Sequence, residues 1–239
     1  MLGEKMAERI SDRFITSYNR LDHSMRKIVG TQEHMSFFRL IDLAKKHSAI
    51  IRKYEADLRE YGDLRNAIVH HRTTSEYAIA EPHDEVVEKM EEIEEALTKP
   101  ITVGQMFSVQ VTVFQETDSL SYALKVIKDK KYNQFPVYRG NQFLGLITPV
   151  RIVMWMASQA EAESFSRTRT TLKQILEYNQ TRENFKFIPE NLSVYEALET
   201  FQHDILKGRR LEALLITEDG KPSDKLIGIV TPISLMKIK

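Results

Sequence analysis

The sequence contains no cysteine, which excludes disulfides, catalytic thiolates and cysteine-ligated metal sites. Five of its seven histidines are scattered, and no His-Glu-x-x-His or similar metal-binding spacing occurs. The five are His23, His34, His47, His83 and His203. Only nine glycines occur, and they form no glycine-rich phosphate loop. We therefore expect no metal ion and no required cofactor in this chain.

Long apolar runs and an excess of charge are also missing. Lysine plus arginine and aspartate plus glutamate each number 34. Residues 1–99 carry 16 basic and 19 acidic side chains, a net charge of −3, and residues 100–239 carry 18 and 15, a net charge of +3. Neither half is typical of an electrostatic nucleic-acid binder. The charged start is not a secretory signal and no segment has membrane-spanning length, so we expect a cytoplasmic protein without a membrane partner.

Apolar residues recur at helical spacing through the first hundred residues. Gly30 follows the first stripe and is a plausible helix stop. An apolar break at Tyr77–Ala80 is predicted to be extended. The pattern predicts a bundle of about four helices in residues 1–98. The predicted helices cover residues 6–28, 37–44, 48–71 and 82–97.

The pattern changes at Thr98-Lys99-Pro100, where we place a domain boundary. Short β-branched runs then alternate with helices, which predicts an α+β chain with two domains, residues 1–98 and 99–239. The predicted strands are Val109–Phe114, Phe135–Tyr138, Phe143–Thr148, Phe185–Ile188, Ala213–Thr217 and Leu226–Thr231.

The second half aligns with itself, and this internal repeat is the strongest signal in the sequence. Thr102–Met106 matches Thr171–Ile175, and Ser119–Leu124 matches Ser193–Leu198. Gly-Leu-Ile-Thr-Pro ending at Pro149 matches Gly-Ile-Val-Thr-Pro ending at Pro232. Each copy is predicted to run helix, strand, helix, strand, strand, helix. One copy is too small to bury both faces of its sheet, so the two are expected to pack together.

These elements and signatures resemble the CBS module: a Val-Gly-Gln-Met opening, a Ser-Leu-x-x-Ala-Leu helix start, Gln-Phe-Pro-Val at residues 134–137, and a Gly-hydrophobic-hydrophobic-Thr ending. The resemblance covers residues 101–158 and 171–239. It implies a tandem pair of β-α-β-β-α repeats, called a Bateman module, that binds adenine nucleotides or related ligands between its modules.

The resemblance also implies which residues meet the ligand. Adenine would lie against the first strand and the hydrophobic-x-Pro turn of each copy. Thr148 and Thr231, each at a strand-to-helix turn, would approach phosphate. The residues implied for the adenine are Val111, Thr112, Val113, Phe135 and Pro136 in the first copy, and Lys186, Phe187, Ile188, Ala213 and Leu214 in the second.

Two departures from the family pattern bear on the ligand. The pattern ends Thr-x-x-Asp, with the carboxylate on ribose hydroxyls, but this chain has Arg151 and Ser234 there. Leu214 also replaces the proline of the second turn. Arg151 could instead pair bidentately with phosphate, which would suit a more phosphate-rich or cyclic dinucleotide ligand. The other ligands that the resemblance implies are AMP, ADP and ATP. The alternative is that both threonines only cap helices and that Arg151 is a solvated helix residue.

Near residue 65 the sequence Arg-Asn-x-x-x-His resembles the HEPN family, which includes metal-independent RNases and non-catalytic partners. His70 would accept a proton and Arg65 would stabilise phosphorane charge, with Asn66 on the face of His70. Arg65 lies about 140° round a regular helix from His70, so one site needs a bend or a second subunit. A bridge from Arg65 to Asp42 or Asp63 is the structural alternative.

The sequence thus predicts a homodimeric regulator in which a CBS pair senses a nucleotide and a HEPN-like bundle provides dimerisation or output. The alternative is a nucleotide-gated endoribonuclease using Arg65, Asn66 and His70, with RNA as a partner. A scaffold with a vestigial CBS pair is the third interpretation.

Overall fold

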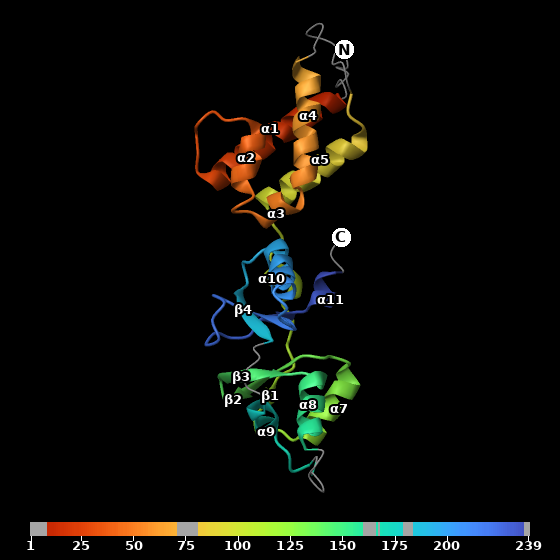
Figure 1. The fold of residues 1–239 in the computed structure, drawn as a ribbon, viewed down its shortest axis with the longest axis vertical. Coiled ribbons are helices and arrows are strands. Elements are labelled where there is room, and N and C mark those ends of the chain that lie inside the picture. Colours follow the sequence, from red (N-terminus) through yellow and green to blue (C-terminus); the bar gives the residue numbers. More distant parts are fainter. Residues whose placement is uncertain (1–8, 71–80, 160–165, 167, 179–183, 237–239) are drawn as a thin grey trace, which may run out of the picture. The chain divides into compact units, whose positions relative to one another are not determined.

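The computed structural model describes residues 9–70, 81–159, 166, 168–178 and 184–236 (Figure 1). The chain divides into two compact units, residues 1–101 and residues 102–239. The predicted extended segment at Tyr77–Ala80 and the predicted helix start at Met6 lie outside the described residues. None of the helices within the described ranges combines the length and the apolar character that crossing a bilayer requires.

The first unit is helical in all its described elements. Its helices are α1 (Ile10–Val29), α2 (Phe37–Ala44), α3 (Ala49–Lys53), α4 (Glu55–His70) and α5 (Asp84–Thr98). The apolar stripe of α1 places Phe14, Leu21 and Met25 in the core, where they are fully buried. The helix ends at Gly30, whose φ of 71° suits the left-handed C-cap and confirms the predicted stop.

One predicted helix of this unit is two helices in the structure. The stripe over residues 48–71 indicated a single helix, but the chain leaves helical geometry at Tyr54, where φ is −106° and ψ is 20°. Ser48 caps α3 by accepting from the N–H of Ile51. Ile51 before the break and Leu58 after it are both fully buried, so tertiary burial on both sides accompanies the break.

The second unit carries two three-stranded sheets and six helices among its described residues. Each sheet belongs to one copy of the repeat, in which a parallel strand pair is followed by an antiparallel one. The first copy contains α6 (Val103–Phe107), β1 (Phe114–Gln115), α7 (Leu120–Lys130), β2 (Phe135–Arg139), β3 (Gln142–Ile147) and α8 (Pro149–Ser158). The second contains α9 (Leu172–Glu177), β4 (Phe185–Pro189), α10 (Val194–Leu206), β5 (Ala213–Thr217), β6 (Gly228–Val230) and α11 (Pro232–Leu235). The predicted order of elements is confirmed.

We use "first module" for β1 to α8 with their sheet and "second module" for β4 to α11 with theirs. The opening helices α6 and α9 are exchanged between the two. Val103 on α6 is buried in a core with Ile188 and Val194 of the second module. Leu172 on α9 is buried with the first module. Each module therefore completes its core with a helix from the other copy.

The two opening helices make equivalent backbone hydrogen bonds to the module that each helix packs against. Val103 N–H donates to the carbonyl of Leu192 at 2.8 Å, just before α10. Leu172 N–H donates to the carbonyl of Asp118 at 2.9 Å, just before α7. The first amides of a helix have no partner within the helix, so each module supplies acceptors for the other copy's opening helix.

The exchange corrects the predicted strand at Val109–Phe114. Only Phe114–Gln115 pairs in the first sheet. Ser108 instead forms a bridge with Gly228 of the second module, and Val109 N–H donates to the carbonyl of Ile227 at 3.3 Å. Residues 108–113 pass from α6 on the second module to β1 of the first, so most of them cannot join the first sheet.

Gly228 tests the exchange because a Cβ there would lie 2.2 Å from the carbonyl oxygen of Phe107 on α6. We expect Gly228→Ala to push α6 off β6 and to lower the free energy of unfolding by about 3 kcal/mol. The control Gly208→Ala faces open space at a φ of 68°, so only backbone strain of about 1 kcal/mol applies. Denaturant unfolding measures both, and an equal loss in the two variants would contradict the exchange.

Candidate functional site

An apolar layer lies between the two sheets of the second unit. Leu146 on β3 is fully buried together with Ala213 and Leu215 on β5. The ring of Phe143 meets the rings of Phe185 and Phe187 edge to face, at centroid distances of 4.9 and 5.0 Å. The structure therefore places two predicted ligand residues, Phe187 and Ala213, in the packed contact between the modules.

Three other predicted residues point into the module cores. Phe135 packs in the first core, and Ile188 and Leu214 pack in the second. Their side chains are exposed by 6% at most. Pro136 is also buried. Such residues can offer a ligand little more than backbone groups and the edge of a side chain.

Val111, Thr112 and Val113 occupy the segment that crosses between the modules. They lie outside any strand, Val111 and Thr112 are partly buried, and Val113 is 42% exposed. Their backbone groups are not part of the β1–β2 ladder, so within the described part of the chain that ladder does not prevent them from pairing with a ligand.

Thr148 and Arg151 share the start of α8. Thr148 is the N-cap and is 1% exposed, and its hydroxyl accepts from the N–H of Arg151 at 3.2 Å. The guanidinium of Arg151 extends to α9, where Nη2 donates to the carbonyl of Leu176 at 2.5 Å. The cap expected under the structural alternative is present, but Arg151 is not a solvated helix residue.

The environment of Arg151 is poor in compensating charge. Burial lowers the pKa of its guanidinium from the ordinary value. Its Nε is buried and has no hydrogen-bond partner, and within the described residues no carboxylate lies at ion-pair distance. A half-buried cation that holds only a carbonyl oxygen favours the binding of an anion.

The second copy differs at the matching position. Ser234 Oγ accepts from the N–H of Thr231 at 2.8 Å and donates to the carbonyl of Thr231 at 2.7 Å. Thr231 in turn accepts from the N–H of Ser234. These two predicted ligand residues therefore satisfy each other within a capping box, and they present no charge to a ligand.

A buried carboxylate that the sequence did not single out holds Lys186. Asp204, on α10, is 2% exposed and lies 2.5 Å from Lys186 Nζ and 2.6 Å from Arg209 Nη2. The hydrogen bond from Lys186, together with the charge of Arg209, holds the pKa of Asp204 below its usual range. Lys186 thus points to α10, away from the apolar layer between the sheets. A single aspartate late in a helix has no sequence pattern that could have revealed this contact.

In the first unit, Arg65 is half-buried on α4. Its guanidinium carbon lies 5.6 Å from the centre of the Tyr18 ring, and its Nε has no hydrogen-bond partner among the residues that the structure describes. Burial raises the pKa of Tyr18 to about 12. Asp42 instead pairs with Lys45 and Arg59, so the predicted bridge from Arg65 to Asp42 does not form.

The rest of the predicted catalytic set is only partly described. Asn66 is exposed on α4, and Asp63 forms no ion pair with Arg65 among the described residues. His70 ends α4, and its side chain lies outside the described residues. Because His70 and Arg65 sit on one regular helix, the structure does not supply the bend that would bring them to one site.

Comparison with known proteins gives a family for the second unit. The family model of the CBS domain matches residues 103–158 and 173–239. No curated protein matches the chain.

Solved structures add three similar folds. A conserved CBS domain protein from Thermoplasma acidophilum has 13% identity, covering 59% of this chain and 70% of that one, with a TM-score of 0.45. The CBS domain pair of MJ0100, in complex with 5′-methylthioadenosine and S-adenosyl-L-methionine, has 16% identity, coverage of 58% and 95%, and a TM-score of 0.44. CBSX2 in complex with AMP has 15% identity, coverage of 57% and 93%, and a TM-score of 0.43.

Asp204→Asn tests the buried carboxylate. Because the pKa of Asp204 is depressed, its ionised form stabilises the folded state fully at pH values above the ordinary pKa of 3.8. This contribution is lost as the pH falls through the lower pKa of the folded state. We expect Asp204→Asn to lower the free energy of unfolding at pH 7 by about 2 kcal/mol and to weaken the loss of stability at acid pH. The control Asp219→Asn removes an exposed carboxylate that pairs with Lys221, and it should change stability little. Equal effects would argue against a structural role of Asp204.

Proposed function

The chain belongs to the CBS domain family, and on this basis we propose that its paired modules bind an adenine-containing or related nucleotide and thereby regulate the helical first unit. The candidate ligands are AMP, ADP, ATP and cyclic dinucleotides. The observation that carries the proposal is Arg151, a half-buried cation with a free Nε and no carboxylate partner among the described residues. We also propose that the protein acts in the cytoplasm.

Phosphate is the anion that suits Arg151 best. A guanidinium can donate two parallel hydrogen bonds to phosphate oxygens. Nη2 of Arg151 is bound to the Leu176 carbonyl and Nε is buried, so a phosphate would engage this fork after the side chain moves. Thr148 stands one turn away at the start of the same helix. The family resemblance would place the base of such a nucleotide against the segment at Val111 and Thr112, which is partly exposed.

The two clefts are not equivalent under this proposal. Arg151 in the first copy offers a positive charge, while Ser234 in the second is engaged with Thr231. A phosphorylated ligand should therefore prefer the cleft of the first module. A ligand with little charge would have no such preference.

Arg151 also links the ligand to the exchange of opening helices. Its acceptor, Leu176, is on α9, whose chain continues into β4 of the second module. An anion that binds Arg151 competes with the Leu176 carbonyl and loosens or redirects α9. Regulation follows if the two arrangements of α9 have different ligand affinities. The altered arrangement of α9 would then affect the HEPN-like helical unit, which serves as the dimerisation or output domain.

We extend the proposal to a homodimer formed through α8. Val150, Val153 and Met154 on this helix are exposed by 42%, 61% and 50%. Three large apolar side chains on one ten-residue helix are more than scattered surface residues, and they fit a self-complementary contact.

Thermal denaturation with a panel of AMP, ATP and cyclic di-AMP tests the ligand. At a ligand concentration of about 100 Kd, binding to the folded state adds about 2.7 kcal/mol, which raises the Tm by several degrees. We expect Arg151→Met to weaken the binding of the effective nucleotide at least about tenfold, because a charge-assisted contact is lost. Lys128→Met, an exposed cation on α7, is the matched control and should bind as the unaltered protein does.

Two results would count against this function. The first is the absence of stabilisation by every nucleotide at millimolar concentration. The second is cleavage of labelled RNA that survives a chelator and disappears in His70→Ala, which would count against a non-catalytic helical unit and support the nucleotide-gated endoribonuclease alternative. Arg65 without a carboxylate partner favours that alternative within the first unit.

Val153→Asp tests the dimer. A carboxylate at this exposed apolar position should convert a dimer to a monomer in sedimentation equilibrium and leave the Tm of the monomer nearly unchanged, because Val153 contributes little to the core. Lys173→Asp on α9 changes an exposed residue outside α8 and serves as control. If the unaltered protein sediments as a monomer, the dimer proposal is wrong.

A further inference from the structure

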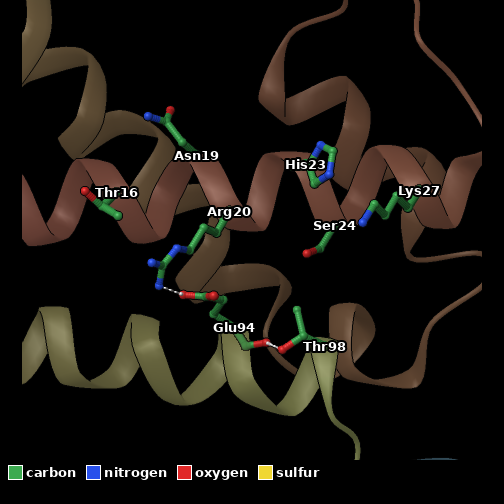
Figure 2. A pocket seen from close by; sticks show the side chains of 8 residues that line it. All are labelled: Thr16, Asn19, Arg20, His23, Ser24, Lys27, Glu94 and Thr98. Atoms are coloured by element: carbon green, nitrogen blue, oxygen red, sulfur yellow. Dashed lines mark hydrogen bonds and ion pairs between the residues drawn. The ribbon is translucent and has the colours of Figure 1, made fainter.

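A groove of about 490 Å³ runs along α1 beside the end of α5 in the first unit. Figure 2 shows Arg20 reaching from α1 toward Glu94 on α5, with Ser24 beside it and Lys27 one turn further on. The groove is open to solvent rather than enclosed. The groove is lined by Thr16, Asn19, Arg20, His23, Ser24, Lys27, Glu94 and Thr98.

All eight lining residues carry polar side chains, and the charge among them is mainly positive. Arg20, Lys27 and His23 are basic, whereas Glu94 is the one acidic lining residue. Positions 20, 23, 24 and 27 lie on one face of α1 because they are three or four residues apart. The groove therefore presents a row of donors: a guanidinium, an imidazole, a hydroxyl and an ammonium group.

The single carboxylate is already engaged. The side chain of Glu94 is only 17% exposed, and its Oε2 lies 3.7 Å from Arg20 Nη1. Thr98 donates its hydroxyl to the carbonyl of Glu94 at 2.8 Å. Arg20 offsets the charge of Glu94 and remains 64% exposed, so its other donors still face solvent. His23, Ser24 and Lys27 form no side-chain hydrogen bond or ion pair among the described residues.

This lack of partners contrasts with neighbouring cations of the unit. Arg13 pairs with Glu91, Arg26 pairs with Asp22, and Lys45 pairs with Glu55. Two basic groups in the groove lack such carboxylates although this half of the chain has an acidic excess, with 19 acidic and 16 basic side chains in residues 1–99. An anion is the ligand that would give these two basic groups a partner.

We propose that the groove binds the phosphate groups of a small phosphorylated metabolite, held by Arg20, His23, Ser24 and Lys27. The size of the groove suits a small molecule. The net charge of −3 over residues 1–99 disfavours a long polyanion such as RNA, whose binding depends on many phosphate contacts. This site lies in the first unit and does not depend on nucleotide binding by the second.

Isothermal titration of the full chain with inorganic pyrophosphate tests the proposal. The double variant His23→Ala/Lys27→Ala should bind pyrophosphate at least about tenfold more weakly, because the charge-assisted contact of Lys27 and the hydrogen bond of His23 are lost. The control Lys46→Ala removes an exposed cation of the same unit that lies outside the groove and forms no ion pair among the described residues, and it should bind as the unaltered protein does. Repeating both titrations in an Arg151→Met background removes the phosphate contact proposed for the second unit, so the binding that remains reports on the groove.

Three results would overturn the proposal. One is the absence of binding by the unaltered chain at 10 mM pyrophosphate. A Kd of that size corresponds to a binding free energy of only about −2.7 kcal/mol. Another is equal affinity in the double variant and in the Lys46→Ala control. The third is a groove-dependent affinity for a twelve-nucleotide RNA without affinity for pyrophosphate, which would replace the metabolite by a nucleic acid.

Discussion

The exchange of opening helices is the contact on which the second unit depends. Each of α6 and α9 begins with amides that need acceptors and carries an apolar side chain that needs a core. The carbonyls of Leu192 and Asp118, placed just before the other module's long helix, supply the acceptors. Val103 and Leu172 enter cores that their own copy does not form. Neither module can therefore bury its apolar surface alone.

Because the modules are joined by this exchange, the difference between Arg151 and Ser234 decides which copy can act on it. Arg151 spans from α8 of the first module to α9, so a charge at the candidate site is attached to the helix that joins the modules. Ser234 closes on Thr231 and reaches no other element through these hydrogen bonds. Two similar sequences thus create one charged position and one neutral position. A phosphorylated ligand would act on the exchange through the charged one.

The first unit distributes its charges differently. Many of its cations pair with carboxylates on neighbouring turns or helices, as Arg59 does with Asp42 and Glu55. Arg65 and the groove residues His23 and Lys27 lack such partners among the described residues. Arg65 lies over the ring of a buried tyrosine, and the groove residues face solvent. Among the described residues of this unit, the cations without an ion pair thus include the half-buried Arg65 and the exposed Lys27 that lines the groove.

The sequence by itself determined the helical first part, the stop at Gly30, the internal repeat and the order of elements in each copy, because periodicity and turn residues act over short distances. It did not indicate the break at Tyr54 or the loss of most of the strand at Val109–Phe114. Tertiary structure decided those, since an apolar stripe shows which face is buried but not which element covers it. The same reason applies to the sites. Thr148 and Arg151 could be marked from the repeat, but the carbonyl of Leu176, the carboxylate of Asp204 and the groove beside Lys27 exist only where distant segments meet in space.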